Sequence, residues 1–216
     1  MKYILFDLDG TITDPKEGIT KSVAYALNKF GIQVEDLDVL CPFIGPPLRA
    51  SFEKFYGFSE KDAELAVKYY REYYGMTGKF ECSIYEGIPE LLKYLKEQGR
   101  TVFLATSKPT GYAKEILEHF DLLQYFDYVA GSSMDASRTE KADVIRHALE
   151  QIPEAKPEEM VMIGDREFDY YGAKEFGIPC ILVTYGYGSL EELEACKSFA
   201  IQETTEGLKE FFKQQS

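Results

Sequence analysis

Short apolar stretches rich in β-branched residues recur along the chain, and each of them ends at small or polar residues. Such stretches are typical of parallel strands that are buried on both faces of a sheet. The segments between them are amphipathic, with apolar residues three or four positions apart, as in helices that pack one face against a core. The predicted strands are Lys2–Phe6, Thr101–Ala105, Tyr128–Ala130, Met160–Ile163 and Cys180–Thr184, and the predicted helices between them are Ile88–Glu97, Tyr112–Phe120, Ala142–Ile152 and Tyr171–Phe176.

This alternation of strand and helix predicts an α/β fold with a doubly wound, mainly parallel sheet. One interval breaks the alternation, because between Pro15 and Cys82 no strand pattern is found. Helices are expected there at Gly18–Phe30, Leu48–Tyr56 and Lys61–Tyr74, separated by glycines and prolines. We therefore predict an α/β core formed by residues 1–14 and 83–216, with an all-helical cap domain, residues 15–82, inserted after the first strand.

The composition excludes several classes of protein. The 216 residues are 45% hydrophobic, which is enough to build a core and is incompatible with an intrinsically disordered chain. Acidic residues outnumber basic ones by 37 to 24, a net charge of −13, so polymeric nucleic acid is not expected as a partner. No apolar run is long enough to span a membrane, and an acid at Asp7 interrupts the first one too early for a signal peptide. We expect a cytoplasmic protein that does not bind membranes.

The four cysteines, Cys41, Cys82, Cys180 and Cys196, are widely spaced and form no C-x-x-C pair. We therefore expect reduced, structural thiols and no cysteine-based metal site.

Acidic residues follow two of the predicted strands directly. Asp7 and Asp9 come after the first strand, and Asp165 and Asp169 come after the strand that ends at Ile163. Because the carboxyl ends of parallel strands meet at one edge of a sheet, where ligands of such folds bind, we expect the four side chains to converge. Carboxylates this close repel one another, and oxygen ligands of this kind favour Mg²⁺.

Other polar residues are expected at the same edge of the sheet. Thr106 and Ser107 follow the second strand of the core, and Lys141 opens a helix after a polar loop. Each has an ordinary alternative, because threonine and serine at a strand end commonly form turns and a lysine at a helix start is commonly solvated.

Taken together, the motifs resemble those of the haloacid dehalogenase superfamily of phosphatases. The order and spacing of Asp7-x-Asp9-Gly10-Thr11, Thr106, Lys141 and Gly164-Asp165-x-x-x-Asp169 are similar to the four motifs of that superfamily. The resemblance covers nearly the whole chain, and the helical interval is similar to the caps that the superfamily inserts between its first and second motifs. The core is then expected to be of the Rossmannoid type found in this superfamily. Within it the chain looks most like the phosphoglycolate phosphatase-like subgroup, and the segments 14–20, 43–48 and 137–141 resemble members assigned as 5′-nucleotidases.

The resemblance implies roles for these residues. Asp7 is expected to attack phosphorus and form an aspartyl-phosphate, and Asp9 to act as general acid and base while its backbone carbonyl binds Mg²⁺. Asp7 and Asp165 are expected as direct metal ligands, with Asp169 as a further ligand or as an acceptor for metal-bound water. Thr106 and Lys141 are expected to hold the phosphate together with backbone amides of Leu8, Asp9 and Ser107. Lys108 is an alternative to Lys141 as the lysine that contacts the phosphate, but it is interpreted as a bystander. Asp14 is interpreted as a structural residue near the cap hinge.

Substrate choice is expected to depend on the cap, where we identify three candidate residues. Phe43, in the segment Phe43-Ile44-Gly45-Pro46-Pro47-Leu48-Arg49, can stack on a base or a ring, or it can belong to the core of the cap. Arg49 can reach the substrate or pair with surface acids. Lys21 lies near the start of the cap and can face the cleft.

The sequence thus predicts a Mg²⁺-dependent phosphatase of small phosphorylated metabolites, a monomer or weak dimer, with a nucleoside 5′-monophosphate as the expected substrate. Asp9 argues against the dehalogenases, ATPases and phosphonatases of the superfamily, which lack an acid at that position. Phosphoglycolate or a sugar phosphate is the alternative substrate. A catalytically inactive binding protein with the same fold is an alternative of another class.

Overall fold

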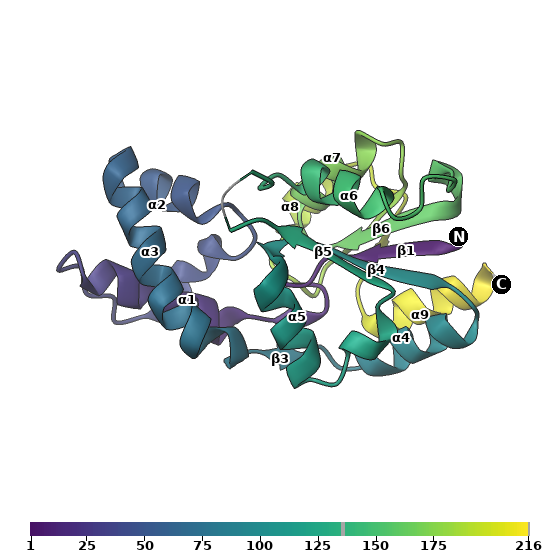
Figure 1. Ribbon diagram of the computed structural model, residues 1–216, viewed down its shortest axis with the longest axis horizontal. Coiled ribbons are helices and arrows are strands. Elements are labelled where there is room, and N and C mark those ends of the chain that lie inside the picture. The colour runs from purple at the N-terminus through teal and green to yellow at the C-terminus, as the bar shows by residue number, and fades with distance from the viewer. Residues whose placement is uncertain (135–136, 216) are drawn as a thin grey trace. The chain divides into compact units, whose positions relative to one another are not determined.

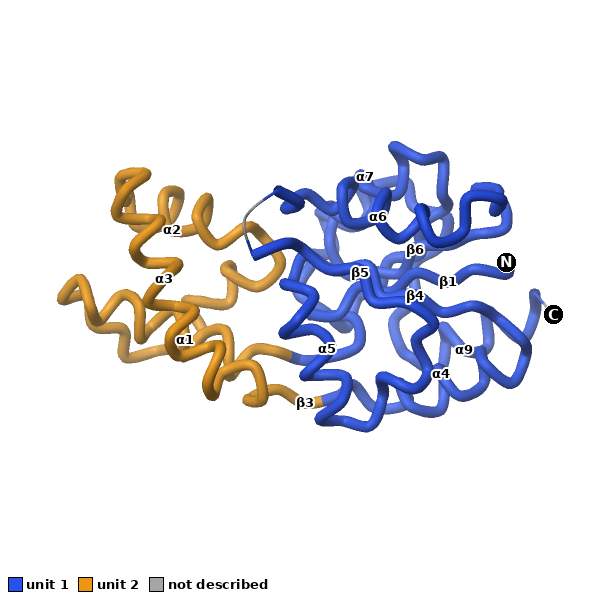
Figure 2. Tube along the Cα trace, viewed as in Figure 1, with its two compact units in different colours: residues 1–14, 84–216 blue, residues 15–83 orange. Residues whose placement is uncertain are grey.

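The structure, a computed structural model, describes residues 1–134 and 137–215. The chain divides into two compact units, which are shown in different colours in Figure 2. The first unit comprises residues 1–14 and 84–216, and the second comprises residues 15–83. The second unit is therefore an insertion into the first.

The first unit is built on a six-stranded sheet with the strand order β5-β4-β1-β6-β7-β8. Every pairing in this sheet is parallel, and Phe6 at the end of β1 lies opposite Leu104 on one side and Ile163 on the other. The predicted α/β class with a doubly wound parallel sheet is confirmed. The strands are β1 (Tyr3–Phe6), β4 (Thr101–Pro109), β5 (Tyr128–Ser132), β6 (Met160–Gly164), β7 (Cys180–Val183) and β8 (Ala200–Gln202).

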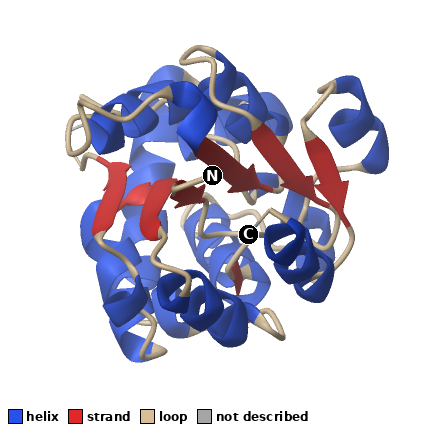
Figure 3. Cartoon of the chain, turned by 90° about the vertical axis from the view of Figure 1, so that its right-hand side faces the viewer, coloured by secondary structure: helices blue, strands red, loops and turns tan. Residues whose placement is uncertain are grey.

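Helices cover both faces of this sheet (Figures 1 and 3). Side chains alternate between the faces along each strand, so Leu5 and Met162 pack with α6 and α7, whereas Ile4 and Val161 point to the opposite face. The helices α4 (Ile88–Glu97), α5 (Thr110–His119) and α9 (Thr205–Gln214) lie on one face, and α6 (Lys141–Leu149) and α7 (Glu167–Lys174) lie on the other; α8 (Leu190–Ala195) follows β7. Both faces are thereby shielded from water, as the continuous apolar strands predicted.

The second unit is helical. Its helices are α1 (Lys16–Asn28), α2 (Leu48–Tyr56) and α3 (Glu60–Met76), with 3₁₀ turns at Leu37–Phe43 and Gly78–Phe80. Ser59 begins α3 by accepting a hydrogen bond from the backbone N–H of Asp62, which satisfies one of the unpaired donors of the first turn. The short strands β2 (Thr13–Asp14) and β3 (Ser83–Ile84) pair where the chain enters and leaves this unit.

Parts of the core differ from the sequence-based expectation. Strand β4 continues to Pro109, because it keeps pairing with β5 after a shift in register between Thr106 and Pro109. Helix α7 begins at Glu167 instead of the expected Tyr171. The sequence pattern missed its first turn, because the residues of that turn are mostly polar and show no apolar periodicity. Strand β8 and helix α9 were not predicted at all. The strand Ala200–Gln202 is short and half-exposed, so its sequence shows no buried apolar run.

Candidate active site

Three carboxylates meet at the carboxyl ends of β1 and β6. Oxygen atoms of Asp7, Asp165 and Asp169 all lie within 4.8 Å of one another, and all three residues are buried. The register explains the convergence, because the backbone N–H of Asp7 donates to the carbonyl of Ile163 across the two strands. Four carboxylates were expected to converge at this sheet edge; these three do, whereas the side chain of Asp9 is not part of the group and pairs with Lys108.

Lys141, the first residue of α6, lies among these carboxylates. Its Nζ atom is 2.8 Å from Oδ1 of Asp7 and 2.8 Å from Oδ1 of Asp169, and it donates to the carbonyl of Ala105 at 3.1 Å. Burial by itself lowers the pKa of Lys141, but the facing charges of Asp169 and Asp7 outweigh it and raise the pKa above its ordinary value. Lys141 is therefore a cation that contacts Asp7 after β1, Ala105 of β4 and Asp169 of α7.

Buried Oδ1 atoms of all three carboxylates have no hydrogen-bond partner among the described residues, and those of Asp7 and Asp169 face Lys141. Oδ2 of Asp165 accepts the backbone N–H of Tyr187 at 2.7 Å, whereas its buried Oδ1 accepts no hydrogen bond from the described residues. Burial, followed by the charges of Asp169 and Asp7, raises the pKa of Asp165 well above its ordinary value. A buried, unsatisfied oxygen in a cluster of carboxylates fits the all-oxygen ligand set of a hard divalent cation such as Mg²⁺.

Gly10 permits the first motif to approach Asp165. Its φ is +80°, a conformation that residues with a Cβ rarely adopt, and an added Cβ would lie 2.1 Å from Oδ2 of Asp165. The glycine after Asp9 is therefore required both by the backbone turn and by the crowding of the carboxylate cluster.

Asp169 is fixed by the start of α7. Its Oδ2 accepts the backbone N–H of Arg166 at 3.1 Å. Glu192 in turn receives hydrogen bonds from the Arg166 side chain and from the backbone N–H of Glu167, so α8 supports the first turn of α7. Burial raises the pKa of Asp169, and the neighbouring charge of Lys141 partly offsets that rise.

The Asp9 side chain has a different partner from the other three carboxylates. Its Oδ2 lies 2.8 Å from Nζ of Lys108, and Thr13 donates to its Oδ1 at 3.4 Å. Burial raises the pKa of Asp9, and Lys108 acts in the opposite direction. Lys108 is itself buried, and Asp9 is a partner that the sequence analysis did not assign to it.

Thr106 and Ser107 lie at the end of β4, next to β1. Thr106 is 1% exposed, and its Oγ1 accepts the backbone N–H of Lys108 at 3.2 Å. Ser107 is half-buried at the point where the register of β4 shifts. Their strand pairs directly with β1, which carries Asp7, and it also supplies the Ala105 carbonyl that holds Lys141.

The three cap candidates all have partners inside the second unit. Phe43 is 2% exposed and packs against the ring of Phe52, with 5.0 Å between ring centroids. Lys21 pairs with Glu17 at 2.5 Å and Glu81 at 2.7 Å. The contact of Phe43 corresponds to the packing alternative, whereas no ion pair was expected for Lys21. Arg49, on an exposed face, pairs in the same way with Glu53, Glu60 and Glu64.

The loop after β7 belongs to the site and was missed by the sequence analysis. The backbone N–H of Tyr187 holds Asp165, the Tyr187 hydroxyl donates to Asp14, and the Tyr185 hydroxyl donates to the carbonyl of Thr11 at 3.0 Å. The available signal was the sequence Thr184-Tyr185-Gly186-Tyr187-Gly188, which contains small and polar residues directly after a buried strand, as the other motifs do.

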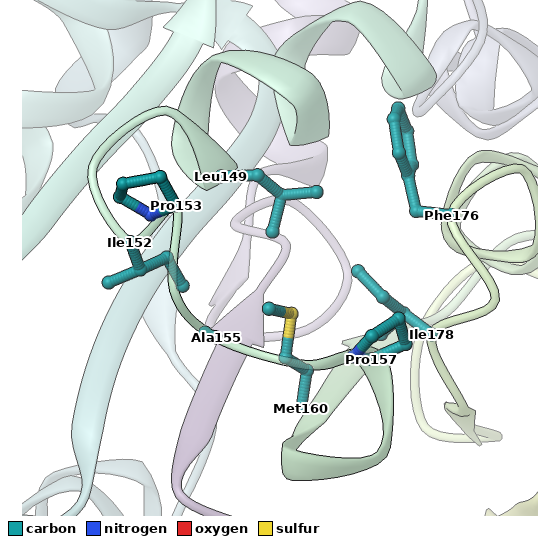
Figure 4. Close-up of a pocket in the computed structure, with 8 residues that line it drawn as sticks. All are labelled: Leu149, Ile152, Pro153, Ala155, Pro157, Met160, Phe176 and Ile178. Atoms are coloured by element: carbon teal, nitrogen blue, oxygen red, sulfur yellow. The ribbon is translucent and has the colours of Figure 1, made fainter.

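An apolar hollow of about 260 Å³ lies elsewhere in the core (Figure 4). It is next to Met160, the first residue of β6, and therefore near the opposite end of that strand from Asp165. It offers no carboxylate or amine for chemistry. Its lining residues are Leu149, Ile152, Pro153, Ala155, Pro157, Met160, Phe176 and Ile178.

None of the helices in the described part of the chain has the length and apolar character that crossing a bilayer requires.

Comparisons with known proteins agree with this geometry. Residues 4–183 match the family described as haloacid dehalogenase-like hydrolase. A curated protein from Pseudomonas aeruginosa named 5′-nucleotidase is 50% identical over 192 residues, which cover 89% of this chain and 86% of that protein. The tyrosine-protein kinase PtkA of Mycobacterium tuberculosis is 39% identical over 193 residues, which cover 89% of this chain and 65% of that protein.

A solved structure shows the same fold at similar identity. The crystal structure of a predicted phosphatase from Clostridium acetobutylicum superposes with a TM-score of 0.94 at 50% identity, and it covers 98% of both chains. The family match spans the strands and motifs that carry Asp7, Thr106, Lys141 and Asp165. The chain therefore belongs to the haloacid dehalogenase-like hydrolases and is a phosphatase of that family.

Proposed function

We propose that this phosphatase is a Mg²⁺-dependent phosphomonoesterase that works through an aspartyl-phosphate on Asp7 and prefers nucleoside 5′-monophosphates. The observation that carries the proposal is the buried cluster of Asp7, Asp165 and Asp169, in which one Asp165 oxygen has no hydrogen bond from a described residue while Lys141 stands beside Asp7.

The cation would be held by carboxylate oxygens of Asp7 and Asp165 and by the backbone carbonyl of Asp9, with Asp169 as a ligand or as an acceptor for metal-bound water. When bound, Mg²⁺ supplies positive charge that offsets the repulsion between the Asp7 carboxylate and the phosphate dianion. The pairing of the Asp9 side chain with Lys108 supports this division, because it keeps that side chain out of the carboxylate cluster.

In the first step, a carboxylate oxygen of Asp7 bonds to phosphorus as the bond between phosphorus and the leaving alcohol oxygen breaks. Lys141 and the hydroxyl of Thr106, with the amide of Ser107, would hold the non-bridging oxygens of the phosphate. Asp9 donates its proton to the leaving oxygen, so the alcohol departs neutral.

In the second step, water attacks the phosphorus of the aspartyl-phosphate. Asp9, now deprotonated, takes a proton from the water and is thereby ready to act as an acid again. The attack releases inorganic phosphate and restores the Asp7 carboxylate, so the two steps together hydrolyse one phosphomonoester.

The preference for nucleotides rests on similarity and not on geometry. The Pseudomonas aeruginosa relative named 5′-nucleotidase is 50% identical over most of both chains. The core residues described above would contact only the phosphate and the metal, so they are compatible with many alcohols as leaving groups.

A substrate panel tests the proposal directly. Purified protein would be assayed with 5 substrate classes at ~10 mM Mg²⁺, and again with EDTA, by release of inorganic phosphate. The classes are nucleoside 5′-monophosphates, nucleoside 3′-monophosphates, phosphoglycolate, hexose phosphates and p-nitrophenyl phosphate. We expect Mg²⁺-dependent turnover, with the highest kcat/KM for 5′-monophosphates. A kcat/KM for phosphoglycolate or hexose phosphates equal to that for 5′-monophosphates would contradict the nucleotide assignment. Undiminished turnover in EDTA would contradict the requirement for Mg²⁺.

A further inference from the structure

Lys108 is a buried cation in the active site for which the proposed reaction has no role. Its side chain is 4% exposed, and its Nζ atom lies 2.8 Å from Oδ2 of Asp9, whose side chain is 15% exposed. The other buried lysine of the site, Lys141, pairs with Asp7 and Asp169 instead. Lys141 thus pairs with the proposed nucleophile, and Lys108 pairs with the proposed acid and base.

The backbone of Lys108 is held by its neighbours. Its N–H donates to Oγ1 of Thr106 at 3.2 Å, within the stretch of β4 where the register with β5 shifts. Its carbonyl oxygen packs against Gly131 of β5 so closely that a Cβ on residue 131 would lie 2.5 Å away. The origin of the Lys108 side chain is therefore fixed by the sheet.

The Asp9 carboxyl is held on both oxygens. Lys108 contacts Oδ2, and the hydroxyl of Thr13 contacts Oδ1 at 3.4 Å. A carboxylate has about four acceptor positions, so these two contacts fix its plane and leave positions open for a proton partner. Proton transfer in a transition state is effective when the donor is held in line with the leaving oxygen.

We propose that Lys108 is a positioning residue that acts through Asp9, holding its carboxyl in the orientation in which it exchanges a proton with the leaving group and with water. This inference rests on the proposed role of Asp9. Lys108 is assigned no bond to the phosphate. Its effect on the rate should therefore depend on the presence of the Asp9 carboxyl and on how strongly the leaving group needs a proton.

A double-mutant cycle tests this dependence. Lys108→Met removes the charge with little change of volume, Lys108→Arg keeps the charge, and Asp9→Asn removes the acid. Each variant and the double variant would be assayed on an alkyl phosphomonoester, which has a poor leaving group, and on p-nitrophenyl phosphate, which has a good one. Lys96→Met is the matched control, because Lys96 makes a similar contact to Asp127 at 2.5 Å on the exposed part of the core.

We expect Lys108→Met to lower kcat on the alkyl ester by about 10- to 100-fold with KM changed by less than about twofold, and to lower kcat on p-nitrophenyl phosphate less. In the Asp9→Asn background the same substitution should change kcat by less than about twofold. Lys108→Arg should restore part of the loss, and Lys96→Met should behave as the wild type.

Three results would overturn the proposal: an undiminished loss in the Asp9→Asn background, a rise in KM without a fall in kcat, or wild-type kinetics of Lys108→Met. The first two would assign Lys108 to the substrate itself. Thermal unfolding of each variant monitors folding, and Lys108→Gln takes the place of Lys108→Met if the latter does not fold. Mg²⁺-dependent turnover by the wild type and its loss in Asp7→Asn test the proposed function separately.

Discussion

The Nζ atom of Lys141 lies 2.8 Å from Oδ1 of Asp7, so the first residue of helix α6 contacts the first residue after strand β1. The contact joins two motifs that are far apart in the sequence. It also places a cation beside the carboxylate that we propose as the nucleophile, in a region from which water is largely excluded.

Asp7→Asn is expected to abolish turnover and formation of the phosphorylated enzyme, because an amide is too weak a nucleophile to attack phosphorus. Rapid quenching after mixing with labelled substrate measures the covalent intermediate, and circular dichroism reports the fold. Asp127→Asn, at the exposed partner of Lys96, is the control. It should retain both the turnover and the formation of the phosphorylated enzyme. Full activity of Asp7→Asn would contradict the assignment of the nucleophile.

Asp9→Asn is expected to slow hydrolysis by about 10²–10⁴-fold, with the larger loss on substrates with poor leaving groups. The physical reason is that the leaving oxygen then departs without a proton. A plot of log kcat against leaving-group pKa measures the effect, and its slope should be steeper for the variant. Parallel slopes for variant and wild type would show that Asp9 does not protonate the leaving group.

Mg²⁺ is expected to stabilise the folded protein, because three carboxylates, those of Asp7, Asp165 and Asp169, lie together and the single charge of Lys141 offsets only part of their mutual repulsion. At a concentration one hundred times its dissociation constant, the gain in the free energy of unfolding is about 2.7 kcal/mol. Urea unfolding with Mg²⁺ and with EDTA measures it.

Asp165→Asn is the companion variant for this experiment. It should lose the stabilisation by Mg²⁺ without being less stable than the wild type in EDTA, because the amide oxygen can still accept the Tyr187 N–H and one disfavoured buried charge is gone. An unchanged response of this variant to Mg²⁺ would place the cation elsewhere.

Gly10→Ala is expected to destabilise the protein by about 1–3 kcal/mol from backbone strain, with a further loss from crowding against Asp165. Gly31→Ala is a matched control, because Gly31 has a φ of +76° and an added Cβ there would meet no atom within 4 Å. The difference between the two variants in urea unfolding isolates the crowding. Equal losses of unfolding free energy in the two variants would show that the carboxylate cluster accommodates the added methyl group without a measurable energetic penalty.

Arg49→Ala is expected to leave KM for each substrate within about twofold and to change stability by less than about 1 kcal/mol, because its partners Glu53, Glu60 and Glu64 are surface acids. Steady-state kinetics on the substrate panel measures KM. A tenfold rise in KM for one substrate class alone would show instead that Arg49 selects the substrate.

The sequence was sufficient to predict the sheet and the convergence of Asp7, Asp165 and Asp169. The strands that carry them are continuous apolar runs, and in a parallel sheet the carboxyl ends of such strands meet at one edge. A residue that directly follows such a strand is therefore expected at this edge of the sheet, whatever the conformation of the loops. Thr106 was expected at this edge by the same reasoning, and it lies inside β4, two residues beyond the last pair with β1.

The partners of these residues could not be predicted in the same way. Lys108 contacts Asp9 from the stretch of β4 in which the register with β5 shifts, and no local sequence pattern predicts such a shift. Tyr187 reaches Asp165 because the loop after β7 folds back over Gly10, which depends on contacts distant in sequence. Strand β8 is short and half-exposed, so it has no apolar run to identify it.

The hydrogen bond from the Tyr85 N–H to the Ile12 carbonyl, 3.1 Å long, joins two residues of the core that flank the helical insertion in sequence. The Tyr185 ring packs on Tyr85, while its hydroxyl binds the carbonyl of Thr11, so the junction is closed from within the core. A junction of this kind lets evolution lengthen, shorten or replace the inserted segment without redesigning the phosphate chemistry. If the insertion selects the substrate, as expected from the sequence, exchanging one contiguous stretch of the gene would change the preference while the core is inherited intact.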